Sequence, residues 1–460
     1  MASCNITSSS RLRSSFLRLD AEFFKPNFVR AAAEIASVVN TVPLRSLCSK
    51  LTQGSNPKFV DEGLPCVNGK NVYYGTMEAG EPNYVSRQEY QRLISFSLEK
   101  NDLVITLKHA TKVGRVWIVE NTLERIFSRN IGLVRLRANS PVEPIIVLLY
   151  LWSRWGQLLL DRSATGGTTG QITLPMSELG RIPIPVFSES EQSEIRRPFT
   201  ASRTAAIKSE SAYAEAKQLL NSELGLEKLI YQKPLSYTAN ASEVSESFRT
   251  DAEFYNPVAK KVVEIIESIP HSRLGQSFSV GNGFPWKSSR FLPDNSGEPV
   301  VRIRNIRPSH TDPSNLTSIV PGYARAVGVS KAQARDIVIG MDGIKYFYAS
   351  MVTGPCYVNQ RVAHLRAKPG SEISPEFATF IINSPLGQAQ LMRDMTVATT
   401  VGHITNRNIR RVVIPTVSQE FHDKITELVS QSINGIEDSK RLLEEAKSRV
   451  EQLIEEAVKS

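Results

Sequence analysis

An internal duplication constrains this chain of 460 residues more than any other feature. Arg18-Leu-Asp20-Ala21-Glu22-Phe23-Phe24-Lys25-Pro26 recurs 231 residues later as Arg249-Thr-Asp251-Ala252-Glu253-Phe254-Tyr255-Asn256-Pro257. Further matches in the same order pair Asp102–Ile105 with Asp336–Ile339, Ser128–Arg137 with Asn359–Arg366, Thr169–Thr173 with Val401–Thr405, and Ile182-Pro183 with Ile414-Pro415. A repeat this long is not a solenoid unit, so the matches predict two domains in tandem.

The duplication also predicts the domain boundaries. We expect a first domain over 1–190, a long helix over 191–230, a linker over 231–248, a second domain over 249–417 and a second long helix over 418–460. The linker is predicted from its polar composition, which is rich in Ser and Ala. The predicted fold class is α+β, with two domains of mixed α/β structure and two long helices.

Each domain is expected to follow the same plan. A short amphipathic helix opens it, over about 26–40 and about 257–268. A β-rich stretch follows, because apolar residues alternate there between Gly, Pro and Asn residues. In the first domain we predict strands within 102–105, 114–119 and 133–137. A buried helix is expected over about 142–159, and its counterpart over about 374–392.

Both long helices carry a heptad pattern. Gly225 is a stop signal for the first, which we expect over about 191–224. Ser432 and Ser439 interrupt the pattern in the second, which we expect over about 419–458. The residues spaced by seven are Phe199, Ala206, Tyr213 and Leu220 in the first helix, and Val429, Ile436, Leu443, Val450 and Ala457 in the second. This period favours helix packing on helix, so the two are expected to pack together.

Composition limits the class of partner. Lys and Arg number 55 against 46 acidic residues, a formal charge of +9, which favours nucleic acid first and a membrane surface second. The longest apolar run, Ile145–Trp152, is too short to span a membrane and predicts a buried element. The cysteines form no CxxC pair, which favours a reducing compartment and a cytoplasmic location. The first 18 residues, rich in Ser and Arg, predict a flexible basic terminus.

Motifs for catalysis are not found in the sequence. Gly63–Asn71 departs from a P-loop in its spacing, and no glycine-rich cofactor loop follows a predicted strand. The six histidines are scattered without metal-ligand spacing. We therefore predict a binding protein without a catalytic centre, metal or cofactor of its own.

The candidate DNA-binding residues lie in turns and loops. Asn and Gln can bond adenine, Arg and Lys can bond guanine, and Thr-rich loops suit phosphate. In the first domain the candidates are Gln53, Asn56, Lys58, Lys70, Asn71, Tyr73, Lys108, Lys112, Thr168, Thr169 and Gln171. In the second they are Trp286, Lys287, Arg302, Arg304, Asn305, Lys345, Gln360, Arg361, Thr399, Thr400 and His403. Tyr73 and Trp286 could equally be core residues.

The loops differ between the domains although the surrounding sequence repeats. Lys108-His-Ala-Thr-Lys112, for example, corresponds to Asp342-Gly-Ile-Lys-Tyr346. A duplicated scaffold with divergent polar loops is what two readers of different sequences require.

The chain resembles the specificity subunits of type I restriction–modification systems, the HsdS family. The resemblance rests on the Arg-x-Asp-Ala-Glu-aromatic opening, the Gly-x-Ile-Thr loop, the Ile-Pro strand ends and the long helix closing each half. Val417 departs from it, since a second proline is common there.

The resemblance implies two target recognition domains with pseudo-twofold symmetry, joined by two antiparallel helices. Each domain would read one half of a bipartite site in double-stranded DNA. Two modification subunits, which bind S-adenosylmethionine and methylate adenine, would dock on the helices, and motor-nuclease subunits would join for restriction. Two alternatives stay open: a specificity subunit of a related type II or other phage-defence methyltransferase, and a coiled-coil scaffold that does not bind DNA.

Overall fold

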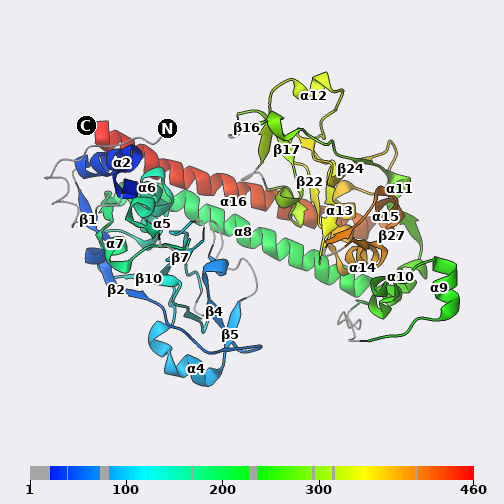
Figure 1. The fold of residues 1–460 in the computed structure, drawn as a ribbon, viewed down its shortest axis with the longest axis horizontal. Helices are drawn as coiled ribbons and strands as arrows, with labels where there is room; N and C mark the ends of the chain where they lie inside the picture. The colour runs from blue at the N-terminus through cyan, green and yellow to red at the C-terminus, as the bar shows by residue number, and fades with distance from the viewer. Residues whose placement is uncertain are drawn as a thin grey trace. The chain divides into compact units, whose positions relative to one another are not determined.

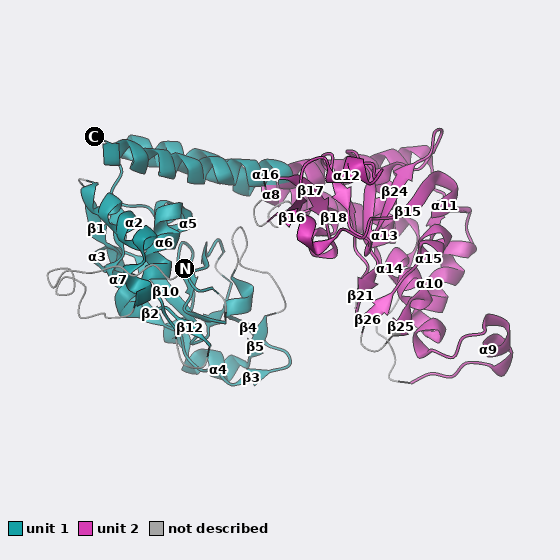
Figure 2. Ribbon diagram, turned by 45° about the horizontal axis from the view of Figure 1, so that its top comes forward, with its two compact units in different colours: residues 1–205, 437–460 teal, residues 206–436 magenta. Residues whose placement is uncertain are grey.

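The computed structural model describes residues 21–38, 40–72, 82–110, 112–121, 123–166, 170–226, 236–292, 296–312, 316–344, 346–398 and 401–459. Contacts divide the chain into two units (Figure 2): unit 1 comprises 1–205 and 437–460, and unit 2 comprises 206–436. The two longest helices, α8 (Glu189–Glu223) and α16 (Gln419–Lys459), each contribute residues to both units. The predicted basic terminus, residues 1–18, lies outside the described residues.

The main sheet of unit 1 is antiparallel, in the order β2-β10-β6-β8. Its strands are β2 (Cys48–Gln53), β10 (Ile131–Leu136), β6 (Leu103–Thr106) and β8 (Val116–Ile118). A second sheet orders β3 (Phe59–Val60), β5 (Asn83–Val85), β4 (Leu64–Val67) and β9 (Ile126–Phe127). Smaller sheets join β11 (Thr165–Gly166), β12 (Ile172–Thr173) and β7 (Lys108–His109), and β1 (Thr41–Pro43) with β13 (Pro183–Pro185). The helices of unit 1 besides the two long ones are α2 (Pro26–Ser37), α3 (Leu44–Leu47), α4 (Arg87–Arg92), α5 (Pro144–Trp152), α6 (Arg154–Ser163) and α7 (Met176–Arg181).

Unit 2 repeats this plan. Its main sheet orders β15 (Phe278–Asn282), β24 (Val362–Ala367), β20 (Ile337–Gly340), β22 (Ala349–Met351) and β18 (Ser309–His310). A second sheet orders β16 (Phe291–Leu292), β19 (Thr317–Ile319), β17 (Glu298–Val301) and β23 (Tyr357–Val358). Smaller sheets join β21 (Asp342–Gly343), β26 (Val401–His403) and β25 (Thr396–Ala398), and β14 (His271–Arg273) with β27 (Val413–Pro415). The helices of unit 2 besides the two long ones are α9 (Ala241–Ser247), α10 (Pro257–Glu267), α11 (Leu274–Ser277), α12 (Tyr323–Ala326), α13 (Pro375–Asn383), α14 (Pro385–Asp394) and α15 (Asn406–Arg411). The α+β class and the tandem repeat are thus confirmed.

The two long helices pack together in each unit, as the heptads predicted, and they run antiparallel, as the resemblance implied (Figure 1). In unit 1 the hydroxyl of Ser202 donates to the Ser439 carbonyl at 2.7 Å. In unit 2 the hydroxyl of Ser209 donates to the Ser432 carbonyl, also at 2.7 Å. The serines that interrupt the heptads are therefore hydrogen-bonded across the seam. A small side chain whose hydroxyl bonds the facing backbone allows two helices to approach closely without an unsatisfied polar group.

The helix pair completes the core of each unit. In unit 1, Ile195 of α8 and Val450 of α16 are fully buried against α5 and the main sheet. In unit 2, Ala216 and Val429 occupy comparable places against α13. The apolar run Ile145–Trp152 belongs to α5 and is buried, as predicted, from Ile146 onward. Among the described helices, none combines the length and apolar character needed to cross a membrane.

The expected single buried helix is instead two helices in each unit. Ser153 and Ser384, with extended backbones, end α5 and α13 and precede α6 and α14. A side chain on Gly156 would lie 2.1 Å from the Tyr150 carbonyl oxygen, so glycine is required where the chain reverses. The prediction of one continuous helix over 142–159 was wrong. Pro385 carries the missed signal, because the residue before proline avoids helical geometry.

The structure also corrects the alignment of the repeats near their ends. Ile184 of β13 pairs with Val42 of β1. Ile414 of β27 pairs in the same way with Ser272 of β14, so Ile184 and Ile414 hold equivalent positions. Ile414-Pro415 therefore corresponds to Ile184-Pro185, and the predicted match with Ile182-Pro183 was wrong by two residues. The predicted match of Thr173 with Thr405 was wrong by the same two residues, because Thr173 pairs with Thr165 as His403 pairs with Thr396. Both copies contain Gly-x-Ile-Thr and Ile-Pro, but these short matches lie out of structural register.

The segment 231–248, predicted as an irregular linker, contains a helix. Residues 241–247 form α9, which ends at Phe248 with a left-handed φ of 53°. Lys260 of α10 donates to both carboxylate oxygens of Glu243 at 2.7 and 2.8 Å, which ties α9 to the second domain. Residues 231–235 lie outside the described part of the chain.

Candidate nucleic-acid interface

The strand pairing of unit 2 gathers several loops at one end of the main sheet. Asn282 at the end of β15 pairs with Ala363 near the start of β24, and Gly340 at the end of β20 pairs with Val362. The loop after β17 joins them, because a side chain on Gly340 would lie 3.5 Å from the Ile303 side chain. Loops that are far apart in the sequence therefore share one end of the sheet.

Most of the predicted residues of unit 2 lie on these loops. Lys287, Arg304, Gln360 and Arg361 are exposed, and Arg302 and His403 are partly exposed. Asp342 links two of them, since its carboxylate oxygens lie 3.5 Å from Nη1 of Arg361 and 2.7 Å from Nδ1 of His403. This end of unit 2 thus combines cations and amides on a framework of antiparallel strands.

Unit 1 has the equivalent cluster. Gln53 at the end of β2 pairs with Gly132 of β10, and its Nε2 donates to the Arg129 carbonyl at 2.5 Å. The strand β7 places Lys108 opposite Thr173 of β12. The exposed predicted residues are Asn56, Lys58, Lys70, Lys112 and Gln171, while Gln53 and Lys108 are partly exposed. The loop that carries Lys58 is held by its backbone N–H, which donates to Glu89 at 2.9 Å.

Three predicted residues lie in the interior. Asn71 and Asn305 are 4% and 0% exposed, and each amide oxygen accepts a hydrogen bond from the backbone N–H three residues earlier, at 2.9 and 3.0 Å. These side chains hold the turns after β4 and β17. Trp286 is 7% exposed, and its ring N–H donates to the Val358 carbonyl at 3.0 Å, so it is a core residue. The other predicted residues on these turns remain at the surface.

Six predicted residues fall outside the described parts of the chain. They are Tyr73, Thr168, Thr169, Lys345, Thr399 and Thr400.

Ion pairs formed by a buried aspartate brace the opposite end of each main sheet. Asp102, which precedes β6, accepts hydrogen bonds from Nε and Nη2 of Arg135 on β10, both at 2.8 Å. Asp336 and Arg366 form the equivalent pair at 2.7 Å. Burial would raise the pKa of Asp336, but hydrogen bonds from Arg366, the Gln333 backbone and His364 outweigh it and lower the pKa below its usual value. The aspartates therefore recur in both halves for a structural reason.

No group of three or more His, Cys, Asp or Glu side chains among the described residues is placed to hold a metal ion. Burial raises the pKa of Cys48 to about 11 and those of Cys66 and Cys356 to about 12, so these thiols stay protonated near neutral pH.

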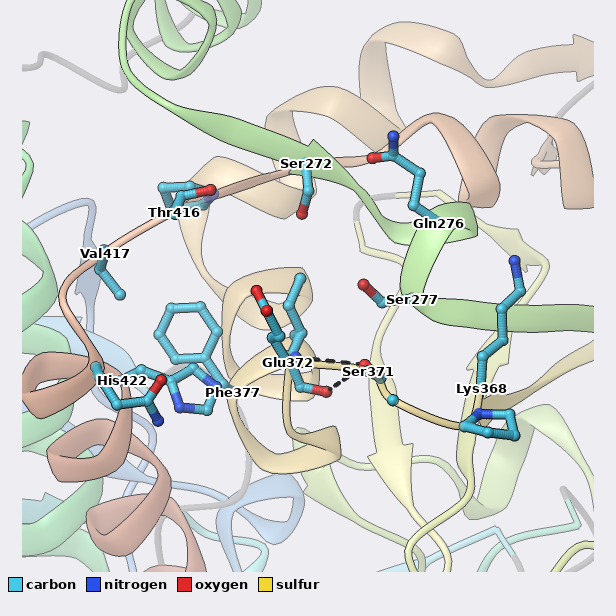
Figure 3. Close-up of a pocket in the computed structure, with 15 residues that line it drawn as sticks. Ser272, Gln276, Ser277, Lys368, Ser371, Glu372, Phe377, Thr416, Val417 and His422 are labelled. Atoms are coloured by element: carbon cyan, nitrogen blue, oxygen red, sulfur yellow. Dashed lines mark hydrogen bonds between the residues drawn. The ribbon is translucent and has the colours of Figure 1, made fainter.

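A pocket of about 350 Å³ in unit 2 lies at the far end of the main sheet from the loops (Figure 3). Its walls include Ser277, just before β15, and Lys368, just after β24. The ring of His422 lies beside that of Phe377, with centroids 4.7 Å apart, and its Nε2 accepts the Ser374 N–H at 3.2 Å. In unit 1, Gln192 accepts the Glu143 N–H in the same way at 3.0 Å. The imidazole is therefore a structural cap at the start of α13.

Sequence reasoning overlooked apolar residues at the interface end of unit 2. Ile344, Tyr346, Val397 and Val401 are 68%, 55%, 55% and 43% exposed, on β25, on β26 and on the loop after β21. Cations, amides and hydroxyls are the usual signals of DNA contact in a sequence, whereas apolar residues in strands normally indicate core. The divergent loop Asp342–Tyr346 was the available signal.

No family model matches the chain. A stretch of 168 residues, 36% of the chain, is 24% identical to the type I restriction enzyme EcoBI specificity subunit of Escherichia coli and covers 33% of it. The chain thus matches about a third of the length of this curated relative. Similar solved structures include the S subunit of a type I restriction–modification system from M. genitalium, 15% identical with a TM-score of 0.43, covering 91% of this chain and 95% of that one. Another is the HsdS subunit of Thermoanaerobacter tengcongensis, 14% identical with a TM-score of 0.28, covering 91% of this chain and 95% of that one. The E. coli match agrees with the resemblance that the repeated motifs predicted.

Proposed function

We propose that this chain is the DNA sequence-specificity subunit of a type I restriction–modification complex, in which each unit reads one half of a bipartite site. One observation carries the proposal. Two units of the same fold each gather exposed cations and amides at the same end of the main sheet, and the side chains there differ between the units. The formal charge of +9 and the similarity to the E. coli subunit support it.

The exposed residues divide into two roles. Asn56 and Gln360 have amides that can pair with adenine, and Arg304 and Arg361 can pair with guanine. Lys58 and Lys287 lie at equivalent positions, three residues after the bridges that pair Ser55 with Ser128 and Phe284 with Asn359. Both units have a cation at this position although they are proposed to read different sequences. A contact to phosphate explains this, because phosphate is present at every base pair.

The chain acts in the cytoplasm and does not itself catalyse methyl transfer or cleavage. Two methyltransferase subunits dock on it, bind S-adenosylmethionine and methylate adenine within the site. Motor-nuclease subunits join the same assembly for restriction. The type I assembly, rather than a type II relative, is identified by a motor-nuclease gene beside the methyltransferase gene.

Methylation mapping tests the proposal. The chain is co-expressed with the methyltransferase subunit encoded beside it in a host without adenine methylation, and the genome is sequenced for modified bases. We expect one bipartite motif with a fixed gap, and none with either protein alone. Methyl transfer by the purified chain alone, or methylation without a bipartite motif, would contradict the proposal.

Binding measurements separate a DNA reader from a scaffold. The co-expressed complex should bind a duplex carrying the mapped motif with an affinity that falls steeply as salt rises. Salt-independent binding, or equal affinity for unrelated duplexes, would favour a coiled-coil scaffold instead.

A further inference from the structure

The guanidinium of Arg302 is stacked on an aromatic ring in unit 2. Arg302 directly follows β17, and its guanidinium carbon lies 5.5 Å from the centroid of the Phe291 ring on β16. The residue is partly exposed and, within the described parts of the chain, forms no ion pair with a carboxylate. Stacking occupies one face of a guanidinium and leaves the N–H donors along its edge available to a ligand.

Both partners of this stack are held in place. Phe291 packs against a small apolar core that includes Trp286 and Tyr357, whose rings lie 5.3 Å apart. The backbone N–H of Arg302 donates to the side chain of the buried Asn305 at 3.0 Å. The guanidinium is therefore oriented before any ligand arrives, which reduces the entropy that its hydrogen bonds must offset.

Arg302 lies among the loops of the candidate interface. The carbonyl of Val301, one residue earlier, accepts the N–H of Asn359 at 3.0 Å, so this turn abuts the loop that leads into β24. Lys287, the proposed phosphate contact, is separated from Phe291 only by a short 3-10 helix. A group that could read a base thus lies beside a group that could hold the DNA backbone.

Unit 1 has the same framework without the guanidinium. Phe59 lies at the position of Phe291 in the strand pairing, and it is 49% exposed. Asn68 lies at the position of Arg302, because each backbone N–H donates to the asparagine three residues later. The side-chain amide of Asn68 donates to the carbonyl of Cys66 at 3.1 Å, within its own turn. The framework therefore does not require an arginine, and Arg302 reflects what unit 2 contacts.

We propose that Arg302, oriented by Phe291, reads a guanine in the half-site of unit 2 by donating to N7 and O6 at the major-groove edge. This rests on the proposed function and adds the base that one unit recognises. The forked donors of a guanidinium match two neighbouring acceptors, and guanine alone presents such a pair in the major groove. A phosphate contact would serve both units equally, yet only unit 2 has this cation. Phe291 acts through Arg302 and is a positioning residue.

Removal of single acceptor atoms from the DNA tests this. The motif is mapped first, and duplexes then carry 7-deazaguanine at one guanine at a time, which keeps Watson–Crick pairing and deletes N7. The complex of this chain with its methyltransferase subunit should bind about tenfold more weakly at the contacted guanine, the effect of one charge-assisted hydrogen bond. In Arg302→Ala the same replacement should have almost no effect. A motif without a G·C pair, or a parent complex insensitive to 7-deazaguanine at every position, would overturn the inference.

Further variants separate the two roles. Arg302→Gln keeps much of the side-chain length and should lose the sensitivity to 7-deazaguanine as Arg302→Ala does. Phe291→Leu keeps an apolar side chain but removes the ring, so the sensitivity should fall, whereas Phe291→Tyr should retain it. Unchanged sensitivity in Phe291→Leu would overturn the positioning role. The matched control is Arg273→Ala, an exposed arginine next to Ser272 of the pocket at the far end of the sheet (Figure 3), which should keep the full sensitivity.

The failures are distinguishable. If the unaltered complex binds no duplex specifically, the proposed function fails. If it binds specifically but Arg302→Ala keeps the sensitivity at every guanine, Arg302 is not a reader. If Arg302→Ala weakens binding to all duplexes alike and reduces the slope of log K against log salt by about 1, Arg302 contacts phosphate and the inference is overturned.

Discussion

Lengthening both long helices together should widen the gap in the DNA motif without changing its half-sites. The perturbation inserts four residues, Glu-Ala-Ala-Lys, after Ala205 in α8 and four more after Ile436 in α16. Both points fall between the two pairs of hydrogen-bonded serines, at the boundary between the units. Ser202 therefore keeps its partner Ser439, and Ser209 keeps Ser432, so neither seam is broken.

The expected change follows from helix geometry. Four residues add about 6 Å at 1.5 Å each and turn a helix by ~40° beyond one full turn. With the helices running along the duplex, 6 Å spans nearly two base pairs, while 40° is close to the ~34° twist of one base pair. We therefore expect the gap to grow by one or two base pairs.

An insertion of seven residues in each helix is the matched control. It adds about 10.5 Å, or three base pairs, but turns the helix about 20° short of two full turns, whereas three base pairs twist DNA by roughly 100°. This variant should lose sequence-specific methylation although its heptads stay in phase. The measurement is methylome sequencing of parent and variants. An active four-residue variant with the parental gap would refute the view that the helices set the spacing.

The remaining predictions concern contacts and stability. Lys58→Ala and Lys287→Ala should each weaken binding similarly on all sequences and reduce the slope of log K against log salt by about 1, whereas a change at one motif position would contradict a phosphate contact. Gly156→Ala should lower the free energy of unfolding by ~2–3 kcal/mol because its Cβ meets a carbonyl oxygen, and Gly166→Ala, with no atom within 4 Å, should not. The lowered pKa of Asp336 means that it stabilises unit 2 above its unfolded pKa of ~3.9 and that this contribution is lost as pH falls through the lower folded value. The urea midpoint of Asp336→Asn should therefore approach that of the parent in acid, and a constant difference from pH 7 to 3 would refute this.

The helices and the repeat could be predicted from sequence because their signals are local and doubled. Heptads over α8 and α16 indicate the packing partner directly, and two copies of one pattern support each other. The two-residue slip at Thr173 and at Ile182-Pro183 arose because Gly-x-Ile-Thr and Ile-Pro occur in both copies out of structural register, and short sequence matches cannot reveal strand pairing. The break at Ser153 was missed because this copy has no proline there, although the other copy has Pro385.

The candidate site was less predictable, because exposure depends on tertiary contacts. Asn71 and Asn305 look like base-reading amides in the sequence, yet both are buried caps of a turn. A correct alignment of the two halves would have indicated this. Asn68-Gly-Lys-Asn71 and Arg302-Ile-Arg-Asn305 share only the final asparagine, and a residue that persists while its neighbours change is needed by the turn itself.

Comparing the two units also separates the remaining interface residues into those that both units share and those that differ. The two units are proposed to read different sequences. A residue that both units share therefore either stabilises the fold or contacts the phosphate backbone, which both half-sites have in common. Lys58 and Lys287 occur at equivalent positions in both units and are exposed, so we assign them to the phosphate backbone of the DNA. Asp102 and Asp336 also occur at equivalent positions, but they are buried, so we assign them to the stability of the fold. Sequence discrimination must then come from exposed positions that differ between the units. The β25–β26 ribbon is one such place, since unit 1 has Gly166 and Gln171 where unit 2 has Val397 and Val401.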